Sequence, residues 1–292
     1  MKAVITGRSG FVGKYLDENL QDHQIETFGY DLKKGQDILD YEHLRNYLDK
    51  HRPQYIFHLA AQAYVPESFV NPKRAIEVNV LGSLNLLEAV RQLGLNCRIL
   101  LAGSSEEYGA AKNSEASLPD PASPYAIAKL TMDYLGRWYA KAYSMNVVVT
   151  RAFNHTGAGR GEQYAESSFA KQIVEIEMGK RDVLLHGNLN SIRNYTDVRD
   201  TVEAYRLAID LPSDVYNICS DQNLAMSEIL NLLSKLAKKK IVTKADPARM
   251  RPTDFSFAKP SAKKFKKLSG WQPQYTIEQT LETIINYWRD EL

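Results

Sequence analysis

The feature that most constrains the fold is the alternation of short apolar runs with amphipathic segments through the first 150 residues. Apolar runs near residues 2–5, 24–30, 54–59, 97–102 and 146–150 have the length of strands buried on both faces. Between them lie longer segments with apolar residues at helical spacing, including 73–93 and 124–143. This alternation predicts an α/β protein with a Rossmann-type, doubly wound parallel sheet.

A glycine-rich turn follows the first predicted strand. Gly7, Gly10 and Gly13 have the spacing G-x-x-G-x-x-G, with Phe11 and Val12 between the last two glycines. Glycines at this spacing let the backbone turn tightly and approach a pyrophosphate at the N-terminus of the next helix. The spacing alone is weak evidence, but its position between the first strand and the first helix favours a dinucleotide site.

An acidic residue at the end of the second predicted strand bears on which dinucleotide binds. Asp31 lies about 20 residues past the glycines, where a carboxylate can accept hydrogen bonds from the adenosine ribose and repel a 2′-phosphate. This position favours NAD(H). Arg8, Lys33 and Lys34 lie close enough in sequence to favour NADP(H) instead, so the preference for NAD(H) is slight.

Two further segments are candidates for dinucleotide binding. Asp37 and Ile38 could cover the adenine, although a turn acid and a core isoleucine would explain them equally well. Leu59, Ala60 and Ala61 follow the third predicted strand, and their small side chains would permit close approach of a ligand at the strand end.

A group of polar residues suited to proton transfer occupies the stretch 104–129. Ser104 follows the fourth predicted strand, at the sheet edge where open α/β folds place their ligands. Pro124 suits the first turn of a helix, so Tyr125 and Lys129 lie four residues apart on one helical face. With the carboxylate of Glu106, these groups could move a proton on or off a sugar or alcohol oxygen.

The regular alternation ends after residue 150. Loops at 152–161 and 187–195 interrupt it, a helix and strand return within 198–218, and the remainder is largely helical in pattern. We therefore expect residues 1–155 and about 187–220 to form the dinucleotide-binding domain. Residues 156–186 and 221–292 would form a smaller, interleaved substrate domain.

Composition and charge argue against several other classes of protein. The formal net charge of +2 argues against nucleic acid as the main partner. No apolar run is long enough for a membrane span, and the chain opens on a strand without a signal-peptide pattern, so we expect a cytoplasmic protein. Cys97 and Cys219 lie in apolar stretches and are not expected to form a disulfide. No residues have metal-site spacing, so no metal is predicted.

Taken together, the motifs resemble the extended short-chain dehydrogenase/reductase family. This resemblance runs in order along the whole chain and implies a Rossmann fold, an NAD(P) cofactor and a Ser/Tyr/Lys catalytic set. The residues that carry it are Thr6-Gly7-x-x-Gly10-Phe11-Val12-Gly13, Asp31, Asp37-Ile38, His58-Leu59-Ala60-Ala61, Asn79-Val80, Ser104-Ser105 and Tyr125-x-x-x-Lys129.

Several longer stretches resemble the nucleotide-sugar branch of this family, in particular its GDP-4-keto-6-deoxy-D-mannose reductases and GDP-mannose 4,6-dehydratases. These stretches are 104–109, 153–157, 187–189, 193–200 and 246–254. The resemblance implies NAD(P)H-dependent reduction of the C4 keto group of a GDP-4-keto-6-deoxyhexose to GDP-6-deoxy-D-mannose, also called GDP-D-rhamnose. It also implies a homodimer formed through the helices at 73–93 and 124–143.

Individual roles follow from the same resemblance. Tyr125 would be the general acid, helped by Lys129, which would lower the pKa of the phenol and hydrogen-bond the nicotinamide ribose. Ser104 would polarise the substrate carbonyl. The residues implied in substrate binding are Ser105, Glu106, Asn154, Arg193, Arg251 and Asp254.

Three alternatives to the reductase remain open. Glu106 stands where the dehydratases place a glutamate, so a GDP-mannose 4,6-dehydratase is the second interpretation. Ser104 and Arg193-Asn194-Tyr195 depart from the threonine and Arg-Asp-Trp usual in dehydratases, which favours the reductase. An NAD-dependent nucleotide-sugar 4-epimerase ranks third. A non-catalytic dinucleotide sensor would not need Ser104, Tyr125 and Lys129 together.

Overall fold

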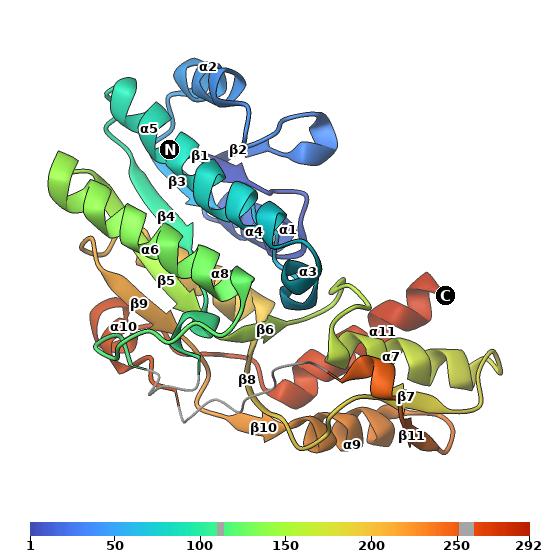
Figure 1. The fold of residues 1–292 in the computed structure, drawn as a ribbon. Coiled ribbons are helices and arrows are strands. Elements are labelled where there is room, and N and C mark those ends of the chain that lie inside the picture. The colour runs from blue at the N-terminus through green and yellow to red at the C-terminus, as the bar shows by residue number, and fades with distance from the viewer. Residues whose placement is uncertain (110–113, 251–259) are drawn as a thin grey trace.

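A six-stranded parallel sheet forms the centre of the molecule, as the alternation predicts (Figure 1). The computed structural model describes residues 1–109, 114–250 and 260–292. The strands pair in the order β2-β1-β3-β4-β5-β9, and every neighbouring pair is parallel. Their bounds are β1 Lys2–Thr6, β2 Glu26–Tyr30, β3 Tyr55–His58, β4 Arg98–Ala102, β5 Asn146–Ala152 and β9 Val215–Ile218.

Helices cover both faces of this sheet, which is the doubly wound arrangement. On one face, α1 (Phe11–Asp22) and α8 (Val198–Ala208) pack with α10 (Lys263–Ser269) over a core that includes Ile5, Phe57 and Leu100. On the other face, α2 (Tyr41–His51), α5 (Gly82–Gln92) and α6 (Pro124–Tyr143) cover Val4 and Ile56. Alternate strand residues therefore serve opposite cores, which explains why the strands are apolar throughout.

β1 lies between β2 and β3, so after β2 the chain crosses to the opposite side of β1 to form β3. A switch point of this kind opens a crevice at the carboxyl ends of the strands, where ligands of open α/β sheets bind. The turn after β1, the end of β2 at Asp31 and the end of β3 at His58 all meet at this edge.

Both long helices predicted from the sequence are present. The first runs from Pro72 to Gln92 as α4 (Pro72–Ile76), a π-helical turn (Glu77–Leu81) and α5, with helical backbone at the junctions. The second, α6, spans Pro124–Tyr143. A short helix that the sequence analysis did not predict, α3 (Val65–Val70), precedes α4.

The second half of the chain builds a smaller unit beside the sheet (Figure 1). Its core is formed by α7 (Ala165–Glu177), α9 (Met226–Leu236) and α11 (Ile277–Glu291). Within 187–220, only β9 joins the six-stranded sheet.

Two small sheets complete the fold. A three-stranded sheet has the order β10-β8-β6, and a two-stranded sheet pairs β11 with β7. The bounds of these strands are β6 Asn154–Thr156, β7 Leu184–His186, β8 Ile192–Asp197, β10 Asn223–Ala225 and β11 Thr243–Ala245.

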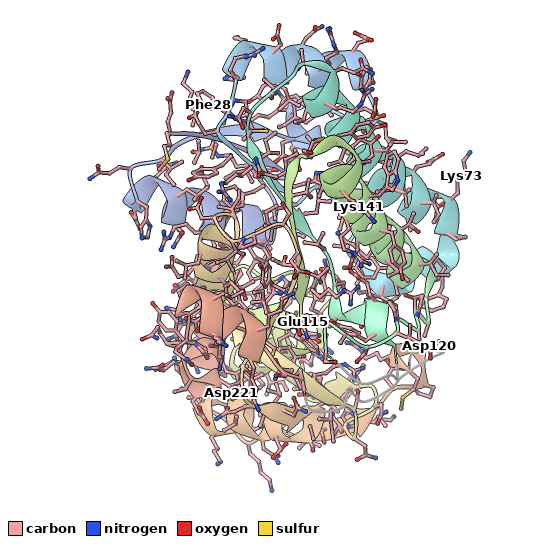
Figure 2. The ribbon with its side chains drawn as sticks, turned by 90° about the vertical axis from the view of Figure 1, so that its left-hand side faces the viewer. Phe28, Lys73, Glu115, Asp120, Lys141 and Asp221 are labelled. Atoms are coloured by element: carbon pink, nitrogen blue, oxygen red, sulfur yellow. The ribbon has the colours of Figure 1, made fainter. Side chains whose placement is uncertain are left out.

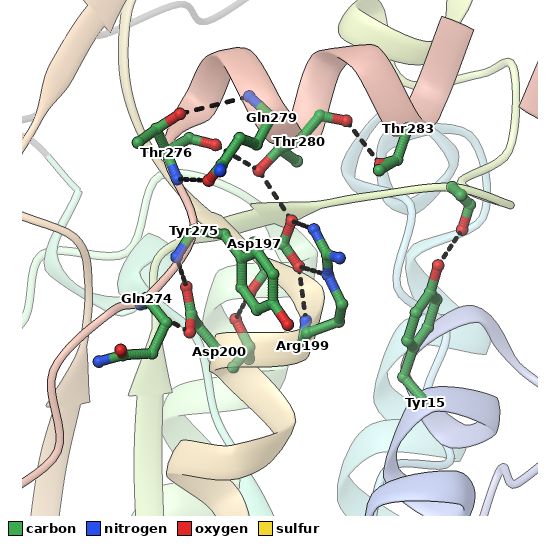
Figure 3. Close-up of polar contacts among 12 residues, drawn as sticks. Tyr15, Asp197, Arg199, Asp200, Gln274, Tyr275, Thr276, Gln279, Thr280 and Thr283 are labelled. Atoms are coloured by element: carbon green, nitrogen blue, oxygen red, sulfur yellow. Dashed lines mark hydrogen bonds and ion pairs between the residues drawn. The ribbon is translucent and has the colours of Figure 1, made fainter. Parts of the chain in front are cut away.

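A polar junction ties the C-terminal helix to the start of α8 (Figure 3). Asp197 accepts hydrogen bonds from the Arg199 guanidinium at 2.8 and 2.9 Å and from the Thr280 hydroxyl at 2.8 Å. Asp200 accepts from the backbone N–H groups of Gln274 and Tyr275. The Asp-Val-Arg-Asp stretch therefore joins the two units, so its acids serve the structure rather than the ligand site.

Among the residues that the structure describes, no helix is long and apolar enough to cross a membrane. The same residues contain no cluster of three or more histidine, cysteine or acidic side chains arranged to hold a metal ion. Cys97 and Cys219 are buried free thiols.

Candidate active site

The glycine-rich turn between β1 and α1 requires its glycines for steric reasons. Gly7 has φ of +75°, and a Cβ placed there would lie 2.9 Å from the backbone nitrogen of Ala60. A Cβ on Gly13 would lie 2.3 Å from the carbonyl oxygen of Gly7. The turn is therefore pressed between the end of β3 and the first turn of α1, which begins at Phe11 after Gly10. Backbone N–H groups at the start of a helix that follows such a turn can bind a diphosphate.

Asp31 closes one side of this turn. One of its carboxylate oxygens accepts a hydrogen bond from the backbone N–H of Ser9, and the other accepts from the Ser9 hydroxyl. Ala60 lies on the opposite side, where its N–H donates to the Thr6 hydroxyl at 3.2 Å. Asp31 and Ala60 therefore both lie against the glycine-rich turn, at the edge where the parallel strands end.

Asp37 and Ile38 lie in the turn that precedes α2. The Asp37 carboxylate accepts from the N–H of Leu39 at 3.0 Å, and the Asp37 carbonyl oxygen accepts from the Tyr30 hydroxyl at 3.0 Å. Ile38 is buried against Gly82, where a Cβ would meet the Ile38 side chain at 2.7 Å. Both residues therefore have structural partners.

Ser104, Tyr125 and Lys129 converge at the end of β4. Ser104 caps a 3₁₀ turn, Ser105–Tyr108, while Tyr125 and Lys129 lie one turn apart near the start of α6. The Lys129 ammonium donates to the carbonyl oxygen of Ala102 at 2.7 Å and lies 6.0 Å from the centre of the Tyr125 ring. All three side chains are buried. The local signals, Ser123 as the helix cap and Pro124 after it, fix where α6 begins.

Burial governs the electrostatics of this group. It raises the pKa of the Tyr125 phenol above its usual value, and a hydrogen bond with Ser104 opposes that rise. Burial also lowers the pKa of Lys129 to about 8, and the negative charge of Glu107 opposes that fall. Desolvation is the largest influence on the Tyr125 pKa, whereas the lowering that the resemblance implies combines Lys129 with the charge of oxidised nicotinamide.

Glu106 and Ser105 lie in the 3₁₀ turn beside the catalytic group. The negative charge of Glu106 adds to the rise in the Tyr125 pKa, as does Tyr164. Ser105 is buried. Neither Ser105 nor Glu106 lines the larger cavity described next.

A cavity of about 440 Å³ is lined mostly by residues of the smaller unit, and it includes Tyr164, which acts on the Tyr125 phenol. Asn154, at the start of β6, and Arg193, on β8, line it. They come together because β6 pairs with β8 in parallel. Arg251 and Asp254, the other two residues expected to bind substrate, lie outside the described residues.

The cavity also contains residues that the sequence analysis did not assign to the site. Arg160 stacks on the Tyr164 ring, with its guanidinium carbon 3.7 Å from the ring centre, and Arg249 donates to the Ser168 hydroxyl at 3.1 Å. Glu166, which is buried, accepts from the Tyr195 hydroxyl at 3.1 Å. The Gly-Arg-Gly sequence around Arg160 was the available signal, since an arginine between glycines in a long loop is unusual for structure alone.

The crevice, the Ser/Tyr/Lys group and the arginine-lined cavity together define a nucleotide-sugar enzyme of the extended short-chain dehydrogenase/reductase type. Residues 4–284 match the family model described as GDP-mannose 4,6 dehydratase, and the chain belongs to that family. The predicted fold, family and class of NAD(P)-dependent nucleotide-sugar oxidoreductase are therefore confirmed.

Individual relatives give a finer comparison. GDP-6-deoxy-D-mannose reductase from Pseudomonas aeruginosa is 32% identical over 296 residues, which cover 99% of this chain and 97% of that protein. The solved structure of RMD from Pseudomonas aeruginosa, complexed with NADPH, has a TM-score of 0.91 and 30% identity, over 100% of this chain and 99% of that one. The solved structure of UDP-glucose 4-epimerase from Thermus thermophilus, in complex with NAD, has a TM-score of 0.90 and 25% identity, over 100% of both chains.

Proposed function

We propose that this chain reduces the C4 keto group of a GDP-4-keto-6-deoxyhexose to GDP-6-deoxy-D-mannose. The observation that carries this proposal is that a cavity lined by Asn154, Arg193 and Arg249 also contains Tyr164, which acts on the buried Tyr125 phenol to which Ser104 is hydrogen-bonded. The similarity to a GDP-6-deoxy-D-mannose reductase along nearly the whole of both chains supports the same reaction.

The side chains divide the reaction between them. The Ser104 hydroxyl hydrogen-bonds the C4 carbonyl oxygen and polarises it. The bound nicotinamide supplies hydride to C4. Tyr125 gives its proton to the carbonyl oxygen, so the carbonyl becomes an alcohol and the phenol becomes a phenolate. Because burial raises its pKa, Tyr125 is protonated at neutral pH, as a general acid requires. Lys129 stabilises the phenolate and returns a proton to it.

The arginines hold the nucleotide. Guanidinium groups bind phosphate oxygens through two parallel hydrogen bonds, and Arg193 and Arg249 approach the cavity from two different elements. Asn154 can add an amide donor. Arg251 and Asp254 extend this set in our proposal, on the strength of the motif they belong to. Ser105 and Glu106 would contact the sugar.

We propose NADH as the preferred form of the cofactor, with Gly7, Gly10 and Gly13 around its diphosphate. A second cavity of about 300 Å³ adjoins Asp31 and is lined by three cations and three carboxylates, so it lacks an excess of positive charge for a 2′-phosphate. Arg8 is paired with Asp17 at 2.6 Å. Phe11, Val12, Asp37, Ile38, Leu59, Ala60 and Ala61 complete the proposed cofactor site.

We also propose that two copies associate through the outer face of α4, the π-helical turn and α6. Exposed apolar side chains gather on these helices, and this flank, where Lys73 and Lys141 are marked in Figure 2, has no covering element among the described residues. Sedimentation at micromolar concentration is expected to show a dimer, and a single monomeric species would contradict it. The exposed apolar residues on this face are Ile76, Leu81, Ile127, Tyr134 and Trp138.

Glu106 supports a second candidate, GDP-mannose 4,6-dehydratase. Dehydration needs an extra acid or base to act at C5 and C6, and the charge of the Glu106 carboxylate acts on the Tyr125 phenol. One assay separates the two reactions: GDP-mannose and GDP-4-keto-6-deoxymannose are offered separately with each reduced cofactor. The reductase consumes cofactor with the keto sugar alone, whereas the dehydratase consumes GDP-mannose without net use of cofactor.

A further inference from the structure

A cluster of buried charges lies directly behind Ser104. The Arg151 guanidinium donates to the Glu107 carboxylate at 2.8 Å and to the Asp133 carboxylate at 2.6 and 2.9 Å. Glu107 and Asp133 are 0% exposed and Arg151 is 2% exposed. Arg137, which reaches solvent, forms a second ion pair with Asp133. Burying two carboxylates around one guanidinium carries a desolvation cost that apolar side chains of similar size would avoid.

Glu107 differs from Asp133 in what it reaches beyond the cluster. Its other carboxylate oxygen accepts a hydrogen bond from the backbone N–H of Ser104 at 2.8 Å. Its negative charge also acts on the buried ammonium of Lys129 and on the phenol of Tyr125. Asp133 has no hydrogen bond to Ser104 among the described residues, although it lies on the same helix as Tyr125 and Lys129.

The backbone before Ser104 is shaped around this carboxylate. A Cβ on Gly103 would lie 2.8 Å from Glu107 Oε1 and 2.7 Å from the carbonyl oxygen of Thr150. The chain therefore leaves β4 in close contact with the carboxylate, and Ser104 emerges from that contact. The Ser104 side chain in turn accepts from the N–H of Glu106 at 3.2 Å, so Ser104 and Glu107 form a reciprocal capping box at the start of the 3₁₀ turn.

We propose that Glu107 is a positioning residue of the reductase, which orients the Ser104 hydroxyl through the backbone and, when ionised, supplies a negative charge near Lys129. The proposal rests on the reaction proposed above. The step it affects is the proton transfer from Tyr125, since an oriented Ser104 and a protonated Lys129 are needed at that moment. The other three members of the cluster keep Glu107 in place.

The charged and titratable groups around these two residues determine the direction of the effect. Lys129 is faced by Glu107 from the 3₁₀ turn, by His58 from β3 and by Tyr125 from its own helix. Burial lowers the pKa of His58 to about 3, so His58 is neutral beside the ammonium. Burial and the Asp133 charge raise the pKa of Glu107 to about 8, while the Arg151 charge and the Ser104 N–H oppose that rise, so the Glu107 charge develops over the same pH range in which Lys129 titrates. Removing the Glu107 charge therefore lowers the pKa of Lys129.

The test combines an NMR titration of Lys129 without substrate with a measurement of kcat as a function of pH. In protein labelled with ¹³C-lysine, with the signal assigned by Lys129→Arg, Glu107→Gln should move the titration midpoint down by about one pH unit, as expected for loss of a nearby opposite charge. The alkaline limb of kcat should move the same way. Asp133→Asn is the matched control: it breaks the same Arg151 pair and should destabilise the fold without lowering either midpoint, because the Asp133 charge acts on Glu107 and not on Lys129.

A shorter acidic side chain at position 107 separates the orientation of Ser104 from the charge near Lys129. Glu107→Asp keeps the charge but withdraws from the Ser104 N–H, so kcat should fall about tenfold with the alkaline limb unchanged, which is the loss expected from one displaced hydrogen bond. If Glu107→Gln does not fold, Glu107→Asp alone tests the proposal. An unchanged kcat in Glu107→Asp would then overturn it. Equal losses and unmoved midpoints in Glu107→Gln and Asp133→Asn would also overturn it. Because the NMR midpoint needs no substrate, it remains decisive if the proposed reaction is wrong.

Discussion

The ammonium group of Lys129 donates a hydrogen bond to the carbonyl oxygen of Ala102, the last residue of β4, at 2.7 Å. This bond joins the first turns of α6 to the strand end from which Ser104 follows. Tyr125, one helical turn before Lys129, is thereby held beside Ser104. The lysine thus has a structural task in addition to the charge that it brings.

Tyr125→Phe should reduce kcat by roughly 100- to 10,000-fold, the range expected for loss of a general acid, while KM and cofactor affinity change little. The substitution removes only the hydroxyl, and Tyr125 is already packed in a buried position. Steady-state kinetics measure kcat and KM, and a cofactor titration measures the cofactor affinity. Tyr134→Phe, on the exposed side of the same helix, is the matched control and should retain full activity. Near wild-type turnover in Tyr125→Phe would contradict the mechanism.

Gly7→Ala should abolish measurable cofactor binding. A methyl group at this position meets the backbone of Ala60 and must also adopt a positive φ. Isothermal titration with NADH measures the loss. Gly94→Ala is the control, because Gly94 also has positive φ, +57°, but has open space around its Cβ position. Gly94→Ala should cost about 1 kcal/mol of the free energy of unfolding and leave the affinity for NADH intact. Equal affinities in the two variants would show that the turn does not contact the cofactor.

Arg193→Lys should raise KM for the GDP-sugar about 10- to 100-fold with a smaller effect on kcat, because lysine lacks the planar fork that binds two phosphate oxygens. Initial rates over a range of sugar concentrations measure this. The same substitution at Arg181, which bonds Glu175 at 2.8 Å and does not line the cavity, should leave KM unchanged. A rise in KM for NADH instead would place Arg193 in the cofactor site.

Glu106→Gln separates the reductase from the dehydratase. If Glu106 only accepts a hydrogen bond from a sugar hydroxyl, the amide can replace it, and reduction of the keto sugar should fall by about tenfold or less. A dehydratase would lose its acid or base and become inactive on GDP-mannose. Rates with both sugars in wild type and variant decide between these outcomes.

The parts of the site that the sequence predicted are those fixed by local geometry. Tyr125 and Lys129 are one helical turn apart whatever surrounds them, and Pro124 fixes the start of their helix. Gly7 and Asp31 were predictable because each follows a strand of a parallel sheet, and parallel strand ends meet at one edge. In these cases neighbouring residues and strand order are sufficient.

The residues that escaped prediction depend on contacts between distant elements. Arg151 meets Glu107 across 44 positions and Asp133 across 18, so no spacing rule links them. The stacking of Arg160 on Tyr164 depends on the path of a long loop. The effect of burial on the pKa of Tyr125 also escaped prediction, because the helical spacing shows the neighbouring cation but gives no measure of burial.

The most direct test of the central claim is the fate of hydride. GDP-4-keto-6-deoxymannose is incubated with NADH that carries deuterium at both C4 positions of the nicotinamide, and the product is examined by NMR and mass spectrometry. The proposed reductase transfers one deuterium to C4 of the sugar for each NADH oxidised, and gives GDP-6-deoxy-D-mannose. A product without deuterium at C4, or consumption of GDP-mannose with no net oxidation of NADH, would contradict the proposal.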